Sequence, residues 1–222
     1  MCGRYTLRTP VEKLAEEFSF DASSMELPPN YNVAPTQEVA AVLSEGDKRR
    51  LEMLRWGLIP PWADDPQIGS RMINARAETA PGKPSFRKAF RERRCLIPAD
   101  GFYEWKRTNG SKQPYFIHMK EGRPFAFAGL WENWNDNGGG PAIRFCTILT
   151  TGPNALVGAI HDRMPVILPP GSYDTWLDPE AQRDELDALL APYPEDETEA
   201  YPVSRFVNSP SNNDPRCVEP AA

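Results

Sequence analysis

The sequence has little of what would place it in several common classes of protein. No segment of its 222 residues approaches the roughly 18 consecutive apolar residues of a membrane helix. Residues 1–10 hold no apolar core of a signal peptide. The four cysteines are widely spaced and form no CxxC pair, so we expect neither a disulfide framework nor a zinc site. We therefore expect a soluble, cytoplasmic monomer without a metal, a cofactor or a membrane partner.

Long helices are disfavoured as well. The sequence contains 24 prolines, and proline inside a helix removes a backbone hydrogen bond. Segments 38–44 and 50–56 predict a hairpin around residues 45–47. Further strands are expected over residues 72–78, 94–99, 101–106, 114–119, 124–131, 143–150 and 200–204. Short helices are expected over residues 10–18, 84–92, 172–177 and 179–191, the first with Thr9 and Glu12 as a capping box.

This order of elements predicts an α+β fold that is mainly antiparallel β. Because strands outnumber helices, we expect the sheet to form a barrel with short helices at its periphery. The sequence has neither an internal repeat nor a low-complexity linker, so we expect a single domain over residues 2–207. Residues 208–222 are rich in proline and asparagine and are predicted to form a loose tail.

Charge is distributed unevenly along the chain. The net charge is −6, but residues 71–107 carry 10 basic and 4 acidic residues. Residues 178–199 carry 1 basic and 9 acidic residues. A local basic patch can bind phosphate whatever the overall sign of the protein. The alternative is that the basic segment is a solvated helix face.

Cys2 offers one specific chemistry. Removal of Met1 leaves a free α-amine and a thiol on adjacent carbons. The amine of such a group forms a Schiff base with an aldehyde, and the thiol then closes a thiazolidine ring. An α-amine with a pKa of about 7.7–8.0 keeps a useful neutral fraction at neutral pH. The alternative is that Cys2 belongs to a frayed terminus without a function.

Four other positions invite two interpretations each. Trp56 and Trp62 bound a loop rich in proline and glycine, and they either fill the core or provide a platform on which bases stack. Glu104 lies between aromatic residues of a predicted strand, as an edge-strand charge or as a catalyst. His161, one of two histidines, lies in a loop before Asp162 and is either structural or a positioned acid/base. In residues 72–78 an extended chain puts Asn74, Arg76 and Glu78 on one face.

Five short segments carry a family resemblance. They are Met-Cys-Gly-Arg at 1–4, Tyr-Asn-Val-Ala-Pro at 31–35, Ile-Asn-Ala-Arg-Ala-Glu at 73–78, Gly-Phe-Tyr-Glu-Trp at 101–105 and Ile-His-Asp-Arg-Met-Pro at 160–165. In this order and spacing the sequence closely resembles the SRAP family, the SOS-response-associated peptidases or abasic site processing proteins. The resemblance covers about residues 2–207 and shows no departure in the five motifs.

The resemblance implies a protein that shields abasic sites of single-stranded DNA during the DNA damage response. It implies self-removal of Met1, a covalent thiazolidine crosslink through Cys2 and a lyase-like activity. Asn74 and His161 match family residues that sense the ring-opened sugar, and Glu104 matches the residue that assists the crosslink. In a bacterial source, we expect association with the nucleoid. The expected DNA contacts are Gly3, Arg4, Asn32, Trp56, Trp62, Arg76 and Arg163, with the three arginines as phosphate clamps.

Two rival functions remain open at this point. Cys2, His161 and Asn74 are also the residue types of a thiol peptidase, either cutting other peptides or cutting only the Met1–Cys2 bond. A third hypothesis is a non-covalent module that binds single-stranded DNA through Trp56, Trp62 and the basic segment.

Overall fold

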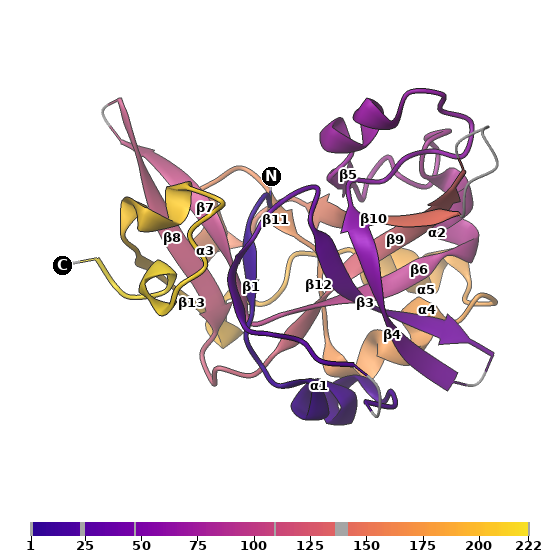
Figure 1. The fold of residues 1–222 in the computed structure, drawn as a ribbon, viewed down its shortest axis with the longest axis horizontal. Coiled ribbons are helices and arrows are strands. Elements are labelled where there is room, and N and C mark those ends of the chain that lie inside the picture. Colours follow the sequence, from indigo (N-terminus) through magenta and orange to yellow (C-terminus); the bar gives the residue numbers. More distant parts are fainter. Residues whose placement is uncertain (1, 23–24, 47, 109, 136–141, 222) are drawn as a thin grey trace.

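The computed structural model describes residues 2–22, 25–46, 48–108, 110–135 and 142–221 (Figure 1). The molecule is built from two groups of strands with short helices around them. In these ranges no helix is both long and apolar enough to cross a membrane.

Five strands close into a barrel, as the sequence predicts. They are β3 (Glu38–Glu45), β4 (Lys48–Trp56), β6 (Arg94–Ala99), β9 (Phe125–Trp134) and β10 (Ile143–Thr151). Each strand pairs with the next in the order β4-β3-β6-β9-β10, and β10 returns to pair with β4. The closing β10–β4 pair is parallel, whereas the other four pairs are antiparallel.

A second, five-stranded sheet lies beside the barrel, to its left in Figure 1. Its order is β13 (Thr198–Pro202), β8 (Ser111–Met119), β7 (Gly101–Thr108), β1 (Tyr5–Leu7) and β2 (Asn30–Val33). Three short strands extend the barrel: β5 (Asn74–Arg76) and β11 (Met164–Pro165) pair with β10, and β12 (Ile167–Leu168) pairs with β9. The predicted α+β fold with mainly antiparallel strands is confirmed.

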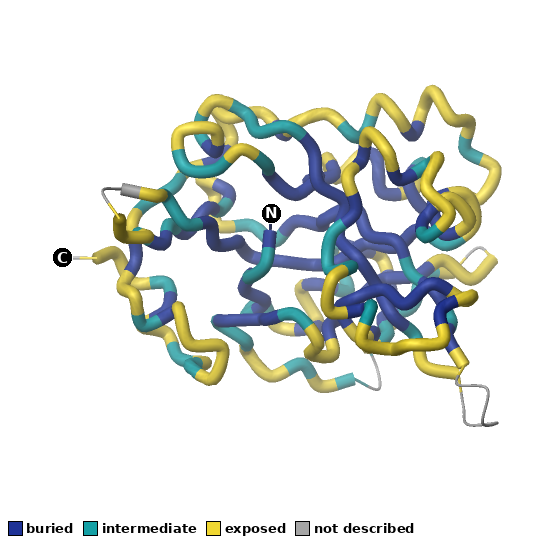
Figure 2. The backbone as a smooth tube through the Cα atoms, turned by 90° about the horizontal axis from the view of Figure 1, so that it is seen from above, coloured by how far each residue is buried: buried dark blue, intermediate teal, exposed yellow. Residues whose placement is uncertain are grey.

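Aromatic contacts join the two groups of strands. The Tyr5 ring of β1 meets Trp56 with ring centroids 5.5 Å apart and Phe127 at 5.7 Å, both edge to face. All three side chains are buried, and such pairs add about 0.5–1.5 kcal/mol beyond area burial. Figure 2 shows the buried backbone running through the middle of the molecule, with the N-terminal end inside it. The contacts fix β1, and therefore the residues just before it, against the barrel.

The helices are short and peripheral, as expected from the proline content. They are α1 (Val11–Phe18), α2 (Arg87–Glu92), α3 (Ala155–Gly158), α4 (Tyr173–Leu177) and α5 (Arg183–Ala188). The 3₁₀ turns are η1 (Pro66–Arg71), η2 (Pro170–Ser172), η3 (Glu195–Glu197), η4 (Arg205–Asn208) and η5 (Pro215–Cys217).

Two details of the helix predictions are wrong. The Thr9 hydroxyl donates to Asp100 instead of capping α1, whose N-cap is Pro10 without a side-chain bond. A capping box formed by Gln182 and Glu185 starts α5 only at Arg183, so this helix is shorter than the predicted 179–191.

The prediction of a loose tail is also wrong for the described residues. The Cys217 side chain is fully buried against a small cluster that includes Val203, Val207 and Tyr103. The Cys217 thiol donates to the carbonyl of Asn212 at 3.3 Å. Residues 208–221 contain few apolar residues, but hydrogen bonds between polar side chains and backbone carbonyls hold the segment in place. A polar composition alone therefore did not reveal that the segment is ordered.

Candidate active site

Cys2 lies three residues before the start of β1 and is fully buried. The position of β1 is set by β2 and β7, with Tyr5 opposite Phe102 and the Tyr103 amide donating to the Arg4 carbonyl at 2.9 Å. The Cys2 Sγ lies 3.9 Å from the same carbonyl. Burial raises the pKa of the Cys2 thiol, and the negative charge of Glu104 raises it further. The thiol is therefore neutral at neutral pH and needs a base to become a nucleophile.

Asn74 holds the backbone of Cys2. The short strand β5 pairs in parallel with β10, which puts Asn74 opposite Ile148. The Asn74 Nδ2 donates to the Cys2 carbonyl at 2.7 Å. The Asn74 Oδ1 is buried and accepts no hydrogen bond from the described residues. Ala75 is buried and Arg76 is exposed, so the predicted alternation of side chains along this strand is confirmed. The Oδ1 atom of Asn74 remains available to accept a hydrogen bond from a ligand.

Glu104 is buried on β7, with only 2% of its surface exposed. Burial raises the pKa of Glu104 to about 7, and the negative charge of Asp162 contributes to the increase. A carboxyl with this pKa is present in both protonation states near neutral pH, which is the requirement for a general acid/base. A solvated edge-strand charge would keep an ordinary pKa, so this interpretation does not fit.

His161 faces Glu104 across the site. Its loop follows α3, whose start is fixed by the Asn154 side chain accepting from the Val157 amide at 2.9 Å. His161 Nδ1 lies 3.0 Å from the Arg163 amide nitrogen, 3.3 Å from the Arg163 carbonyl and 3.0 Å from Asp162 Oδ1, so the ring is held in place and its tautomer decides which of these contacts are hydrogen bonds. The His161 Nε2 lies 3.8 Å from Glu104 Oε2. Burial lowers the pKa of His161, so the ring is neutral at neutral pH.

Three charged residues act on this cluster or on Arg163 next to it, and of the three only Arg107 gave no signal in the sequence. Asp162 contacts the His161 ring at 3.0 Å and raises the pKa of Glu104. The positive charge of Arg107 lowers the pKa of His161. Glu78 binds the Arg163 guanidinium through two bonds of 2.6 and 2.9 Å. The Asp162-Arg163 pair beside His161 was the available signal in the sequence.

The structure corrects two of the expected DNA contacts. Trp56 is fully buried, and its indole nitrogen donates to the Ile73 carbonyl at 2.8 Å, so the ring is part of the core and offers no face to a base. Asn32 is 1% exposed, and its amide nitrogen donates to backbone carbonyls of the C-terminal segment. Both side chains are therefore structural in this conformation.

The other expected contacts differ in how accessible they are. Trp62 is 59% exposed and Arg76 is also exposed. Gly3 is partly exposed beside Cys2. The Arg4 guanidinium donates to Asn32 and to two backbone carbonyls, and Arg163 is occupied by Glu78 and by the Thr150 carbonyl at 2.6 Å.

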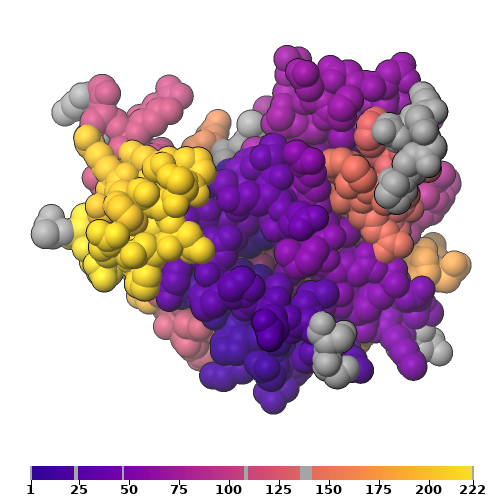
Figure 3. All heavy atoms as spheres, viewed as in Figure 1, coloured from indigo at the N-terminus to yellow at the C-terminus, as the bar shows by residue number. Residues whose placement is uncertain are grey.

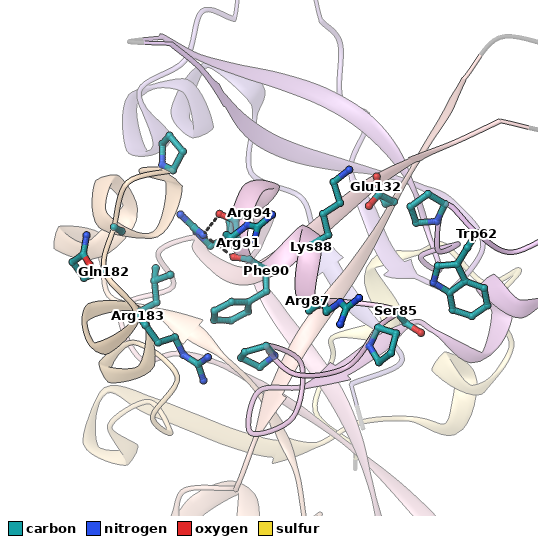
Figure 4. A pocket seen from close by; sticks show the side chains of 16 residues that line it. Trp62, Ser85, Arg87, Lys88, Phe90, Arg91, Arg94, Glu132, Gln182 and Arg183 are labelled. Atoms are coloured by element: carbon teal, nitrogen blue, oxygen red, sulfur yellow. Dashed lines mark hydrogen bonds between the residues drawn. The ribbon is translucent and has the colours of Figure 1, made fainter.

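A hollow of about 770 Å³ lies between α2 and α5, with Trp62 at its edge (Figure 4). Arg87 and Lys88 of α2 line it between Trp62 and Phe90. Its lining residues include none of Cys2, Asn74, Glu104 and His161, so the hollow is separate from the cluster around Cys2. Across the described ranges, no cluster of three histidine, cysteine or acidic side chains could hold a metal ion.

A buried N-terminal thiol, a carboxyl with a pKa near 7 and a neutral histidine now stand together in a barrel fold. The chain belongs to the SRAP family: the family model described as SOS response associated peptidase (SRAP) matches residues 1–210. It is similar to the abasic site processing protein YoqW of Bacillus subtilis (strain 168), with 51% identity over 223 residues and 99% of each chain covered.

More distant relatives show the same full-length similarity. The abasic site processing protein YedK of Escherichia coli (strain K12) is 31% identical over 227 residues, covering 99% of this chain and 100% of its own. A crystal structure of a protein from Bacteroides thetaiotaomicron superposes with a TM-score of 0.90 at 30% identity, covering 100% of both chains. The similarity in three dimensions therefore includes the whole described fold.

Proposed function

We propose that the protein processes abasic sites in single-stranded DNA by forming a covalent thiazolidine through Cys2. The observation that carries the proposal is the convergence of Cys2, Asn74, Glu104 and His161 from four separate segments. The names of the relatives YoqW and YedK support an abasic site as the substrate. Shielding of the site during the DNA damage response fits the description of the family.

Maturation comes first in this proposal. Met1, which lies outside the described residues, is bonded to the Cys2 nitrogen, and an amide nitrogen cannot form an imine. Hydrolysis of the Met1–Cys2 bond releases the α-amine while Asn74 retains the Cys2 carbonyl. This single cleavage agrees with the peptidase in the family description. Intact mass distinguishes the mature chain from the precursor by one methionine residue.

Ring opening of the abasic sugar is the next step. The protonated form of Glu104 gives a proton to the ring oxygen O4′ as the C1′–O4′ bond breaks, and a base takes the proton of the C1′ hydroxyl. Glu104 Oε2 and His161 Nε2 are 3.8 Å apart, which is too far for a direct hydrogen bond, so the proton that the two halves of this step require passes between them through one bridging water. The product is the C1′ aldehyde, for which the buried Asn74 Oδ1 can accept a bond from a sugar hydroxyl.

Capture of the aldehyde follows in three bond changes. The α-amine of Cys2 adds to C1′, and the resulting carbinolamine loses one water to give the imine. The thiol then adds to C1′ while its proton passes, through Glu104, to the nitrogen. The raised pKa of the thiol makes a base at this position necessary, and a carboxylate with a pKa of about 7 can serve. The net result is a thiazolidine and one released water.

DNA outside the lesion is proposed to contact exposed groups. Trp62 can stack on a base, and Arg76 can bind a phosphate, as can Arg87 and Lys88 in the hollow near α2. Arg4 and Gly3 lie beside Cys2; the acceptors of Arg4 are uncharged, so its positive charge still attracts the strand. We propose a weaker contribution from Arg163, because Glu78 neutralises it.

The two rival functions are less well supported. A thiol peptidase acting on other peptides is less well supported because the relatives YoqW and YedK are named for abasic site processing. A module that only binds DNA non-covalently needs no acid/base groups, so it does not account for the raised pKa of Glu104 and the lowered pKa of His161.

The test is the intact mass of the purified protein, alone and after incubation with a single-stranded oligonucleotide that contains one abasic site. We expect a mass without Met1, and an adduct equal to protein plus DNA minus one water. Cys2→Ala should give no stable adduct, while Cys95→Ala, which also removes a fully buried thiol, should behave as the unchanged protein. Retention of Met1 in crosslinking-competent protein would contradict the mechanism.

A further inference from the structure

We propose that residues 204–221 are a positioning element for the reaction, held by Arg4 and Asn32, and that this segment fixes Cys2 relative to Glu104. The inference rests on the proposed function and adds two positioning residues to it. Figure 3 shows the C-terminal segment in yellow, packed as one compact body against the N-terminal part of the chain. The two regions are far apart in sequence: Arg4 bonds to Val207 and Asn208, which lie 203 and 204 residues after it.

Arg4 links the segment directly to Cys2. Its guanidinium donates to the Val207 carbonyl at 2.9 Å and to the Asn208 carbonyl at 3.2 Å. The carbonyl of the same Arg4 accepts the Tyr103 amide and lies 3.9 Å from the Cys2 thiol. A displacement of the Arg4 side chain by a loose segment would therefore move the backbone that carries Cys2.

Asn32 is the second anchor. It lies on β2, which pairs with β1, and its Oδ1 accepts a bond from Arg4 at 2.8 Å. Its Nδ2 is within hydrogen-bonding distance of three carbonyls, those of Val207 at 3.1 Å, Ser209 at 2.9 Å and Asn212 at 2.9 Å. An amide has two N–H donors and an oxygen acceptor, so Asn32 uses both donors on the segment and its oxygen on Arg4.

The segment also contacts the strand that carries Glu104. The indole nitrogen of Trp105, the next residue, donates to Asn208 Oδ1 at 2.8 Å. Asn208 thus bonds Arg4 through its backbone and Trp105 through its side chain. One residue of the segment bridges the neighbours of both reacting groups, so the spacing between the Cys2 thiol and the Glu104 carboxyl depends on it.

The anchoring cluster is separate from the main core. The residues that hold the segment down, Tyr103, Phe116, Val203, Val207 and Cys217, form their own buried group. The barrel residues belong to a different and much larger cluster. Release of the segment should therefore disturb the geometry at Cys2 while the barrel stays folded.

Asn32→Asp is the most direct test. The substitution keeps the shape of the side chain and the oxygen that accepts from Arg4. It replaces the amide nitrogen, which donates toward three carbonyls, by a carboxylate oxygen that those carbonyls repel. Asn208→Ala is the milder second variant, because it removes the bond to Trp105 and retains the backbone contact with Arg4. Glu219→Gln is the matched control, since Glu219 is an exposed residue of the same segment.

The measurement is single-turnover crosslinking over a range of abasic oligonucleotide concentrations, with the melting temperature of each variant. Misplacement of a reacting group by about 1 Å can cost roughly 10²-fold. We expect Asn32→Asp to lower the maximal rate by roughly 10–10²-fold and Asn208→Ala by less, with the half-saturating DNA concentration unchanged. Glu219→Gln should match the unchanged protein in both quantities.

Amide hydrogen exchange across Arg4–Thr6 and Tyr103–Trp105 gives a second measurement that needs no reaction. Asn32→Asp should speed exchange there and leave the barrel strands protected. An increased half-saturating concentration at an unchanged maximal rate would make Asn32 a DNA contact and overturn the inference. Unchanged rates would overturn it too, as would unchanged exchange. If the unchanged protein forms no adduct, the proposed function fails, and the exchange measurement alone decides whether the segment holds the two strands.

Discussion

The catalytic cluster and the hollow near α2 are built in opposite ways. In the cluster, Cys2 and Glu104 are buried, their pKa values are raised, and the Cys2 backbone is held by Asn74. At the hollow, Trp62 is exposed, and Arg87 and Lys88 line the surface. Proton transfer needs desolvated groups at fixed distances. Contact with a flexible strand needs charge and flat apolar faces in reach of solvent. Under the proposed function, burial therefore separates the residues of the reaction from those of strand binding.

The largest difference between the two regions should appear on removal of the thiol. Cys2→Ala should abolish the heat-stable adduct, because no thiazolidine can close, while binding of DNA through Trp62 and the basic residues stays unchanged. The remaining α-amine can still form an imine, so borohydride should trap a Schiff base, and strand cleavage by β-elimination should be seen. A heat-stable adduct with Cys2→Ala on a denaturing gel would favour a lysine as the nucleophile.

Replacement of the acid/base should give the next largest effect. Glu104→Gln should slow crosslinking by ~10²–10⁴-fold without weakening DNA binding. If the carboxylate is the active form in the slow step, the rate of the unchanged protein rises with pH through about 7, and Glu104→Gln lacks this inflection. His161→Ala and Asn74→Ala should also be slower. Equal rates for Glu104→Gln and the unchanged protein between pH 6 and 8 would remove Glu104 from the mechanism.

Replacement of the two tryptophans that flank residues 57–61 should affect different properties, namely stability for Trp56 and DNA binding for Trp62. Trp56→Ala should destabilise the fold by about 3–5 kcal/mol, since the ring is fully buried. Trp62→Ala should leave the melting temperature unchanged and weaken binding of single-stranded DNA by roughly 1–3 kcal/mol. Thermal unfolding and a DNA titration on both variants make the comparison. A stability loss for Trp62→Ala equal to that for Trp56→Ala would mean that Trp62 is a core residue.

The buried carboxyl should also make stability depend on pH. The pKa of Glu104 rises from 4.5 to about 7 on folding, so the folded state binds the extra proton between these values. Stability is therefore lost as the pH rises from 4.5 through 7, by about 3 kcal/mol at most. Glu104→Gln should be more stable than the unchanged protein at pH 8, and this difference should vanish below pH 4.5. Urea unfolding at both pH values checks the sign.

The smallest effects should come from single charges at the hollow. Lys88→Gln or Arg87→Gln should reduce the slope of log affinity against log salt by about 0.7 if each neutralises one phosphate of a single strand. The maximal rate of crosslinking should not change. Lys120→Gln, which alters an exposed cation outside the lining of the hollow, is the control. An identical slope for Lys88→Gln and this control would exclude a phosphate contact at Lys88.

The sequence was informative where a residue type has few alternative uses. Cys2 and Glu104 lie in short motifs, and the chemistry of an aminothiol and of a carboxyl between aromatic residues pointed to both. The alternation predicted for residues 72–78 placed Asn74 correctly, as the burial of Ala75 confirms. The misassigned residues, Trp56 and Asn32, depend on distant partners. Three carbonyls from residues 207–212 bury Asn32, and the Ile73 carbonyl holds the indole of Trp56. A local pattern does not contain such partners, because backbone carbonyls look the same in every sequence.

The contact of Arg4 with Val207 has a consequence for the order of synthesis. Cys2 is made among the first residues, and its positioning partner follows 203 residues after Arg4. At about 5–20 residues per second, roughly 10–40 seconds of synthesis separate the two. Throughout this interval the Cys2 thiol is present without the segment that positions it. Under the proposed function, full reactivity toward a sugar aldehyde therefore arises only when translation has passed residue 208, so that an incomplete chain becomes attached to DNA more slowly.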